Sequence, residues 1–329
     1  MPRTLHARHD RFALARPFRI ARGVKTHADV ITVTVTEDGV EGRGEGVPYP
    51  RYGESVESAL AEIESVRAAI EAGAGREALL SLLTPGAARN AVDCALWDLE
   101  ARRAGRDVAG LLDLAPPAVL VSAITLGIDT PEAMAEAARA AAETPLLKVK
   151  VDADDPAARI RAVRAAAPRS ALIVDPNESW DEALVRAMEP ILLEAEIDLL
   201  EQPVPAGEDE WLEGFEPGVP ICADEAVHVA ADLETVARRY QAVNVKLDKS
   251  GGLTAALDLA RATRARGLGL MTGCMVSSSL SIAPAFYVAA LSDFVDLDGP
   301  LWLRDDRQGG VRDEGGLLSP PAPGFWGGR

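Results

Sequence analysis

The sequence has few of the residues that mark disulfide-rich, nucleophilic or membrane proteins. Its three cysteines, Cys94, Cys222 and Cys274, are scattered in apolar surroundings, so we expect free, buried thiols. None of its four histidines follows a predicted strand, and it has neither a glycine-rich nucleotide fingerprint nor a nucleophile elbow. No apolar run could span a bilayer, and no secretion signal precedes the first strand. We therefore expect a cytoplasmic enzyme.

The sequence has fewer basic residues than acidic residues. The chain has 51 Asp+Glu against 34 Lys+Arg, a formal net charge of −17. Such a surface repels polyanions, so we expect no nucleic acid and no membrane as a partner. The hydrophobic fraction of 48% over 329 residues is that of a globular protein with a large core. The sequence does not decide between a monomer and a homo-oligomer.

Lysine is the scarcest basic residue. Only five of the 34 basic residues are lysines, and they fall at three places: Lys25, the pair Lys148 and Lys150, and the pair Lys246 and Lys249. An arginine does not release its proton in a protein, whereas a lysine in a partly dry site can. We interpret these places as ones where a titratable amine is needed. Chance and codon usage are the alternative.

Two hairpin strands are predicted early in the chain. Residues 30–36 and 40–47 are rich in β-branched residues and flank Asp38-Gly39, a pattern typical of a tight hairpin. The cation-rich segment 18–25 before them is expected to be a loop between two early strands.

Helices follow the strands in this part of the chain. Residues 55–83 and 87–104 show apolar residues at helical spacing, and Gly105 ends the second helix. Strands first and helices after predict a separate α+β domain over residues 1–115. Pro116-Pro117 marks its expected end.

From about residue 116 short apolar strands alternate with alanine-rich helices. Eight strands are predicted, at residues 120–126, 146–151, 171–175, 197–201, 219–224, 242–247, 268–272 and 294–298. Eight βα repeats predict a (β/α)8 barrel over residues 116–304, with shortened helices and loops. The glycine- and proline-rich tail, about 305–329, is expected to pack back on the first domain.

Acidic residues end three neighbouring strands of this barrel. Asp175, Glu201 and Asp224 each follow apolar residues, one βα repeat apart, so they should meet at one mouth of the barrel. Buried carboxylates need a partner cation, and three hard oxygen ligands suit Mg²⁺ with positions left for substrate and water. We expect one Mg²⁺ per subunit. Taken singly, each acid would more often be a helix cap or a surface residue.

Lysines of the second and sixth strands flank the predicted metal site. Side chains alternate along a strand, so Lys148 and Lys150 share a face, and like charge with desolvation should lower their pKa. We expect Lys150 and Lys246 to lie on opposite sides of the α-carbon of a metal-bound carboxylate. One removes its proton and the other returns a proton, while Lys148 stabilises the enediolate. Schiff-base chemistry is the alternative.

Two further groups of charges are candidates for substrate binding. Asp296 and Asp298 share a face of the eighth strand, where two carboxylates would bind an ammonium group; a turn acid is the alternative for Asp298. Arg22 and Lys25 could pair with a second substrate carboxylate, unless they are solvated loop charges. Lys249 is interpreted as a loop residue with no role.

Taken together, these motifs resemble the enolase superfamily, specifically its muconate-lactonizing subgroup. The resemblance covers nearly the whole chain, through Lys148-Val149-Lys150, Asp175-Pro176-Asn177, Glu201-Gln202-Pro203, Ala223-Asp224-Glu225 and Lys246. It implies a modified (β/α)8 barrel with an N-terminal α+β capping domain, and it implies that Asn177 and Glu225 support the metal ligands. Residues 88–98 resemble a helix at the start of the family's barrel region, which would move the boundary earlier than Pro116.

Within the subgroup, the chain resembles dipeptide epimerases. Residues 296–300, 20–23 and 48–55 resemble the L-Ala-D/L-Glu epimerases of murein peptide recycling. This implies a dipeptide substrate inverted at its C-terminal α-carbon, with its ammonium group on the aspartate pair and its glutamate side chain read by the early loop with Arg22. It also implies that Thr125 and the stretch around Met275 line the dipeptide.

Other reactions of the subgroup remain open at this point. An N-acylamino acid racemase, a cycloisomerase and an o-succinylbenzoate synthase-type enzyme use the same metal and lysines, but none needs an ammonium-binding acid pair. The resemblance is incomplete at Ser277, because some dipeptide epimerases carry a glutamate at the comparable position. This difference leaves the identity of the dipeptide undecided. A barrel that binds an acidic ligand without chemistry is the alternative outside enzymes.

Overall fold

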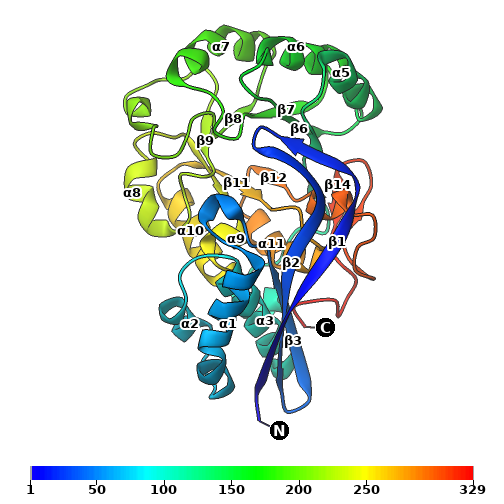
Figure 1. Cartoon of the computed structure of the whole chain (residues 1–329), viewed down its shortest axis with the longest axis vertical. Coiled ribbons are helices and arrows are strands. Elements are labelled where there is room, and N and C mark those ends of the chain that lie inside the picture. Colours follow the sequence, from blue (N-terminus) through cyan, green and yellow to red (C-terminus); the bar gives the residue numbers. More distant parts are fainter. Residues whose placement is uncertain (1, 329) are drawn as a thin grey trace.

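The computed structural model describes residues 2–328 and consists of an N-terminal sheet with helices and a barrel (Figure 1). The sheet is antiparallel and has the order β1 (Thr4–Ile20), β2 (Gly23–Glu37) and β3 (Val40–Gly46). The predicted hairpin is confirmed, because β2 pairs with β3 and the turn residues Asp38 and Gly39 have positive φ angles.

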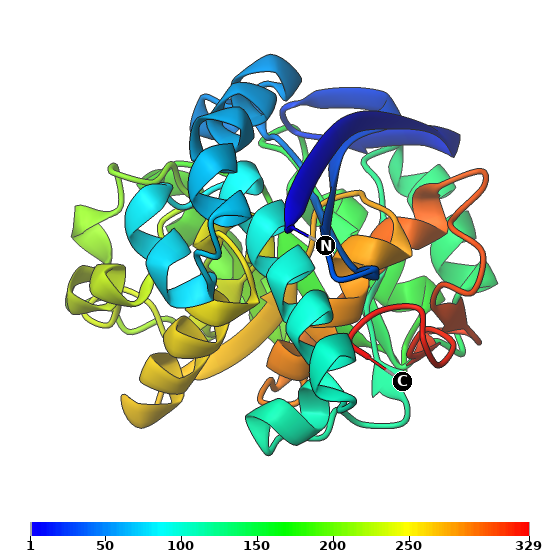
Figure 2. The ribbon, with the colours of Figure 1, turned by 90° about the horizontal axis from the view of Figure 1, so that it is seen from below.

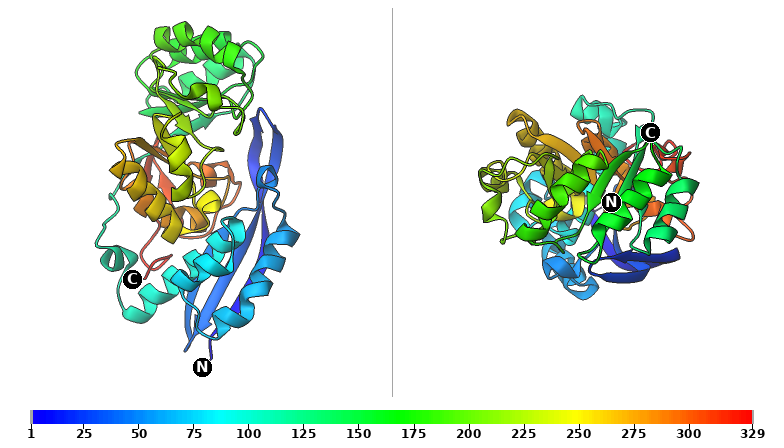
Figure 3. Two further views of the ribbon diagram at one scale, coloured as in Figure 1. Left: turned by 90° about the vertical axis from the view of Figure 1, so that its left-hand side faces the viewer. Right: turned by 90° about the horizontal axis from the view of Figure 1, so that it is seen from above.

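The segment 18–25, predicted as a loop, is instead paired strand. Phe18 pairs with Lys25, and the ladder continues until only Ala21 and Arg22 form the turn. The prediction was wrong because this end of the hairpin lies outside the apolar core that the sheet shares with its helices, so no apolar alternation marks the strands. The hairpin therefore rises beside the barrel as a paired ribbon (Figure 3, left).

Two helices pack on the sheet, α1 (Val56–Glu71) and α3 (Ala87–Ala104), and α2 (Arg76–Leu82) packs against α3. The single helix predicted over residues 55–83 is wrong, because the chain leaves α1 through Gly73, which has a φ of 104°. The helix predicted over residues 87–104 is confirmed, and Gly105 ends it in the left-handed conformation.

Helix α3 joins the two parts of the molecule (Figure 2). On one side it approaches β3 closely, because a Cβ atom on Gly42, Gly44 or Gly46 would lie only 2.1–2.3 Å from a backbone atom of α3. On the other side, Asp93 accepts a hydrogen bond of 3.0 Å from the backbone N–H of Thr254 in the barrel. The cap is thus held in one position relative to the barrel mouth.

The barrel consists of eight parallel strands, as predicted. In chain order these are β5 (Ile124–Leu126), β6 (Leu146–Lys150), β7 (Ala171–Asp175), β8 (Leu199–Glu201), β9 (Ile221–Ala223), β10 (Ala242–Val245), β11 (Gly269–Gly273) and β12 (Phe294–Asp296). The ladder is continuous from β5 to β12, and one backbone hydrogen bond of 2.8 Å, from Ala123 to Val295, nearly closes the circle.

The strand predicted over residues 120–126 is divided in the structure. Only β5 belongs to the barrel, whereas β4 (Leu120–Val121) pairs antiparallel with β14 (Leu317–Ser319) of the tail. The apolar run is continuous in the sequence because both pieces are partly buried, so apolar content alone could not show the change of sheet.

Helices flank the barrel unevenly. The longer ones are α5 (Pro131–Ala140), α6 (Pro156–Ala166), α7 (Glu182–Glu194), α10 (Leu253–Ala265) and α11 (Ser279–Ala289). The remaining elements are short: η1 (Pro50–Tyr52), α4 (Val108–Leu112), η2 (Glu210–Leu212), η3 (Ala230–Asp232), α8 (Leu233–Val236), α9 (Leu247–Ser250), η4 (Gly299–Trp302) and β13 (Arg312–Asp313). The expected shortening of the barrel helices is therefore concentrated after β8, β9 and β12.

The interior of the barrel changes from apolar to charged along its axis. Near the amino ends of the strands it is filled by a buried cluster consisting of Ala123, Leu146, Ile173, Leu199, Cys222, Ala242 and Met271. On β6, Leu146 belongs to this cluster, and Lys148 and Lys150 share its face by alternation, whereas Val149 packs in the outer core with the helices. The strands therefore direct their charged side chains toward the mouth at their carboxyl ends.

Two further expectations concern thiols and membranes. Cys94, Cys222 and Cys274 are all free, as expected, and the first two are buried, but the expected burial is wrong for Cys274, which is partly exposed. Within residues 2–328 no helix combines the length and the apolar character that crossing a bilayer requires.

The tail contacts both the sheet and the barrel. Arg307 is central to these contacts: its guanidinium lies 2.8 Å from Glu45 of β3 and 3.1 Å from Asp10 of β1. Glu45 also accepts a hydrogen bond of 2.8 Å from the backbone N–H of Ser278, at the start of α11. The extents of the two domains and of the tail remain a prediction.

Arg307→Met should destabilise the fold by about 3–5 kcal/mol, because it leaves the fully buried Glu45 carboxylate without its cation. Burial already raises the pKa of Glu45, and a protonated carboxyl needs no cation. We therefore expect a smaller loss at pH 5 than at pH 8. Urea unfolding at both pH values measures this, with the exposed Arg304→Met as the control. Equal losses for both variants would contradict the prediction.

Candidate active site

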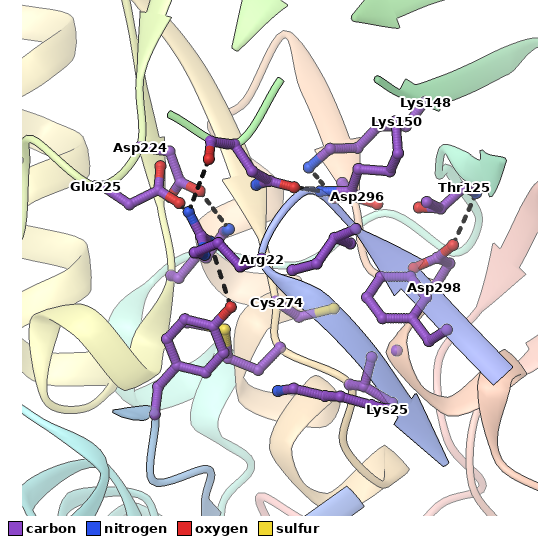
Figure 4. Close-up of a pocket in the computed structure, with 18 of the residues that line it drawn as sticks. Arg22, Lys25, Thr125, Lys148, Lys150, Asp224, Glu225, Cys274, Asp296 and Asp298 are labelled. Atoms are coloured by element: carbon purple, nitrogen blue, oxygen red, sulfur yellow. Dashed lines mark hydrogen bonds and ion pairs between the residues drawn. The ribbon is translucent and has the colours of Figure 1, made fainter. Parts of the chain in front are cut away.

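A cleft that is open to solvent, with about 580 Å³ of empty space in and above it, lies between the carboxyl ends of the barrel strands and the tip of the β1–β2 hairpin (Figure 4). It brings together most of the residues predicted from the sequence: Arg22, Lys25, Thr125, Lys148, Lys150, Asn177, Asp224, Glu225, Lys246, Met275, Asp296 and Asp298. The other two, Asp175 and Glu201, are fully buried beneath it. The roles of all these residues remain predictions.

Lys148 lies at the floor of the cleft among carboxylates. Its ammonium group is 2.7 Å from Glu201, 2.8 Å from Asp296 and 3.1 Å from Asp175. Burial disfavours this charge, but the three acids, Asp296 first, outweigh burial and raise the pKa of Lys148 well above its usual value. Lys148 therefore stays protonated at neutral pH.

Lys150 and Lys246 face the cleft from opposite sides of the barrel. Lys150 ends β6 and Lys246 follows β10, and three strands separate β6 from β10 in the ladder. The ammonium group of Lys150 lies 2.5 Å from Asp175, and that of Lys246 lies 2.6 Å from Asp224. Each lysine is thus held by one acid of the predicted metal site.

The expected lowering of the lysine pKa is wrong for Lys148, and the pKa of Lys246 is raised as well. Burial does act in that direction on Lys246, but the carboxylate of Asp224 outweighs it and raises the pKa. The like charges of neighbouring lysines predicted a lowered pKa, but each lysine touches a carboxylate in the folded chain. Opposite charge at contact distance dominates over like charge farther away.

The three acids expected to bind the metal converge on shared cations. Asp175, Glu201 and Asp224 are at most 1% exposed, and the ammonium group of Lys148 contacts the first two. Lys246 contacts Asp224 and lies 3.9 Å from Glu201. Ammonium groups lie between these carboxylates. Within residues 2–328, no set of three or more acidic, histidine or cysteine side chains is arranged to hold a metal ion.

The chemistry of this donor set nevertheless fits a divalent cation. Burial, and then repulsion from Asp175, raises the pKa of Glu201 to about 7, so the lysines do not fully balance the negative charge. Carboxylate oxygens are the ligands that Mg²⁺ prefers. A metal cation bound among these acids would relieve the repulsion between Asp175 and Glu201 that raises the pKa of Glu201.

Two residues near the acids were missed in the sequence. Lys249 is 1% exposed, and its ammonium group lies 2.6 Å from Asp224. The interpretation of Lys249 as a loop residue is therefore wrong, because it is buried beside a predicted metal ligand. Lys246 precedes α9 and Lys249 lies within it, and a spacing of three residues brings both to one side. Asn244 donates a hydrogen bond of 2.9 Å to Glu201, and its position two residues before Lys246 on β10 was an available signal.

Asp296 and Asp298 lie together at the edge of the cleft, and each has one engaged oxygen. Lys148 contacts Asp296 at 2.8 Å, and the backbone N–H of Thr125 donates to Asp298 at 2.8 Å. The other oxygen of Asp296, Oδ1, is buried and has no hydrogen-bond partner within residues 2–328. Burial, and then the charge of Asp296, raises the pKa of Asp298 to about 6.

Arg22, at the tip of the hairpin, is bound to acids of the barrel. Its guanidinium lies 2.7 Å from Glu225 and 3.2 Å from Glu178, and it donates to the hydroxyl of Tyr49 at 3.3 Å. Figure 4 shows Arg22 beside Glu225, which lies in the loop after β9. Arg22 therefore fastens the tip of the hairpin over the cleft.

Asn177 and Met275 complete the surroundings of the lysines. Asn177 follows β7 in the left-handed conformation, with a φ of 47°, and its side-chain oxygen accepts a hydrogen bond of 3.0 Å from Lys150. Met275 packs with Val30, Val47 and Tyr49 under the hairpin. One residue thus orients a lysine, and the other forms part of the apolar wall.

Models of two families match the chain. The N-terminal domain of mandelate racemase / muconate lactonizing enzyme matches residues 3–113, and the enolase C-terminal domain-like family matches residues 132–325. The two matches together cover most of the chain, and they correspond to the cap and the barrel.

Two curated relatives cover almost the full length. The chain is 45% identical to the L-Ala-D/L-Glu epimerase of Escherichia coli, over 92% of this chain and 95% of that protein. It is 43% identical to the N-acetyl-D-glutamate racemase of a Pseudoalteromonas species, over 91% of this chain and 95% of that protein.

Two solved structures have the same fold throughout. An enolase family member from Agrobacterium tumefaciens with homology to dipeptide epimerases, solved with sodium and L-Ala-L-Glu, has a TM-score of 0.96 and 47% identity, over 99% of this chain and 100% of that one. A dipeptide epimerase from Enterococcus faecalis, solved with Mg and L-Leu-L-Tyr, has a TM-score of 0.90 and 30% identity, over 98% of each chain.

These comparisons confirm the predicted resemblance and the predicted enzyme class, an epimerase. The capped, nearly closed barrel and the matches over both of its parts lead to one assignment. The chain belongs to the mandelate racemase / muconate lactonizing enzyme family of the enolase superfamily.

Proposed function

We propose that this protein is a Mg²⁺-dependent dipeptide epimerase that inverts the α-carbon of the C-terminal residue, with L-Ala-L-Glu and L-Ala-D-Glu as its substrates. The observation that carries the proposal is the placement of Lys150 and Lys246 on opposite sides of one cleft, with carboxylates between them. A relative that acts on L-Ala-D/L-Glu and a structure solved with L-Ala-L-Glu support the choice of dipeptide.

Asp175, Glu201 and Asp224 would hold the cation. A bound Mg²⁺ supplies positive charge that acidifies the substrate α-proton by stabilising the charge that develops on the adjacent carboxylate. The solved Enterococcus faecalis dipeptide epimerase was determined with Mg, which supports this choice of ion. One ion per subunit is the expected stoichiometry.

The lysines divide the proton transfer among them. Lys150 and Lys246 face opposite sides of the bound α-carbon, so a proton taken by one and a proton given by the other produce inversion. Lys148 keeps its proton because of its three acidic neighbours, which suits it to stabilise negative charge rather than to act as a base. The pKa of Lys246 depends on Asp224, so it falls when Asp224 is engaged elsewhere.

The aspartate pair distinguishes a dipeptide from an N-acyl amino acid. The free Oδ1 atom of Asp296 and the raised pKa of Asp298 indicate negative charge that the single ammonium group of Lys148 does not balance. The N-terminal ammonium group of a dipeptide supplies a second cation, whereas an N-acetyl group does not. The N-acetyl-D-glutamate racemase relative makes N-acetylglutamate the second candidate substrate, because it shares the glutamate but lacks the ammonium group.

Changing Asp296 and Asp298 together to Asn should lower kcat/KM for L-Ala-L-Glu by about 10²- to 10³-fold, the cost of removing a buried partner from a charge. Activity on N-acetyl-L-glutamate should change far less. Deuterium uptake at the α-carbon in D₂O, followed by NMR, measures both.

The wild-type protein serves as the reference in this test. If wild type exchanges N-acetyl-L-glutamate faster than L-Ala-L-Glu, the second candidate is the correct one. If the double variant loses both activities to the same extent while its melting temperature is unchanged, the acid pair does not bind the ammonium group. A wild-type protein that exchanges neither compound would contradict the proposed reaction.

A further inference from the structure

Glu201 is the least anchored of the three acids expected to bind the metal. Asp175 accepts a hydrogen bond of 2.8 Å from the backbone N–H of Asn177 and contacts two lysines. Asp224 also contacts two lysines, each at 2.6 Å. Oε2 of Glu201 lies 2.7 Å from the ammonium group of Lys148 but has no hydrogen-bond partner within residues 2–328. A glutamate has one more rotatable bond than an aspartate, so it needs more support to keep one orientation.

The side chain of Asn244 supplies that support. Asn244 belongs to β10 and precedes Lys246 by two residues, so the alternation of the strand directs both side chains into the barrel. Asn244 is fully buried, and its Nδ2 atom donates a hydrogen bond of 2.9 Å to Oε1 of Glu201. Lys148 on β6 and Asn244 on β10 therefore hold the two oxygens of this carboxylate from strands on either side of β8.

The other end of the amide indicates which of its atoms matters. Oδ1 of Asn244 is buried and has no hydrogen-bond partner within residues 2–328, and a buried acceptor without a partner lowers the stability of the fold. An amide turned the other way would place this oxygen against the carboxylate of Glu201, which only accepts hydrogen bonds when it is ionised. The donor is thus engaged while the acceptor is not, as expected of a residue kept for its N–H group.

The neighbouring strand β11 leaves room for this amide. A Cβ atom on Gly273 would lie 2.7 Å from Oδ1 and 2.9 Å from Nδ2 of Asn244, and 2.9 Å from Cε of Lys246. A larger residue at this position would therefore displace the amide or the lysine. Gly273 lies directly beside the amide instead, and this close packing limits how far the amide can rotate.

We propose that Asn244 is a positioning residue: its N–H group fixes the orientation of Glu201 and thereby makes the site selective for Mg²⁺ over Ca²⁺. Mg²⁺ requires near-ideal octahedral geometry, whereas Ca²⁺ accepts flexible geometry, and hydrogen-bond partners behind a metal ligand contribute to the affinity. Because Asn244 is fully buried, it acts through Glu201 rather than on the substrate. This inference rests on the proposed Mg²⁺ site and adds to it a residue that determines the choice of ion.

Asn244→Leu tests the proposal, because leucine has the branched shape of asparagine but no N–H donor. Isothermal titration calorimetry with MgCl₂ and with CaCl₂, in the absence of substrate, measures the Kd of each ion. We expect the Kd for Mg²⁺ to rise by about 10- to 100-fold, and the Kd for Ca²⁺ to rise by less than about threefold. Asn244→Ser, whose hydroxyl is too short to reach Glu201, should show the same pattern and keeps the test decisive if the leucine variant does not fold.

Thr272→Val is the matched control. It removes a buried hydrogen bond of 2.7 Å between Thr272 and Ser292, on the outer side of β11, and it should leave both Kd values unchanged. An unchanged Kd for Mg²⁺ in the Asn244 variants, equal losses for the two ions, or an equal loss in Thr272→Val would overturn the role of Asn244. Wild-type protein that binds no Mg²⁺ would instead contradict the proposed function, so the two failures can be told apart.

Discussion

Lys150→Ala and Lys246→Ala should each abolish epimerisation of L-Ala-L-Glu, with a loss of about 10⁴-fold, the upper range for a general base. Inversion needs one group to take the proton and another to deliver it from the opposite side, so removing either lysine stops it. Each variant should still exchange the α-proton of one epimer, since the remaining lysine can take and return a proton on its own side. The two variants should retain exchange of different epimers.

The measurement follows deuterium incorporation by NMR and inversion by polarimetry, from both L-Ala-L-Glu and L-Ala-D-Glu. Lys150→Arg and Lys246→Arg are the matched controls, because arginine keeps the positive charge next to Asp175 or Asp224 but does not release a proton. They should be as inactive as the alanine variants. Retained inversion in either arginine variant would show that the lysine acts only through its charge, and the two-base scheme would be wrong.

Removal of divalent cations should also abolish activity, and Mg²⁺ should restore it. A readout independent of turnover is thermal stability: Mg²⁺ at about 100 times its Kd should stabilise the fold by about 2.7 kcal/mol. Protons compete with the cation for Glu201, whose pKa burial raises to about 7. The increase in melting temperature caused by Mg²⁺ should therefore be larger at pH 8 than at pH 6.

Glu201→Gln provides the matching variant, because it keeps the shape of the side chain and removes its charge. It should reduce both the thermal shift and its pH dependence. Glu178→Gln, which alters an acid that contacts Arg22 and Arg51, should leave the pH dependence intact. An unchanged melting temperature in Mg²⁺, together with full activity after chelation, would contradict the proposed cation site.

Much of the site could be predicted because strand periodicity is a local property. Alternation along residues 146–150 places both lysines inside the barrel, and the spacing of one βα repeat brings Asp175, Glu201 and Asp224 to one mouth. The structure places all of them at or beneath one cleft. Where the prediction failed locally, as for the loop at residues 18–25 and the helix over 55–83, the backbone was governed by pairing or by a single glycine that composition does not reveal.

The sequence by itself determined the family, the barrel and the set of charged residues at the strand ends, because these follow from spacing along the chain. The tertiary structure alone decided which charges touch. It pairs Lys148, Lys150 and Lys246 with acids, and it leaves Lys25 facing the cleft beside an aromatic ring. The pKa of a buried group depends on neighbours within a few ångströms that are far away in sequence, and only the folded chain brings those neighbours together.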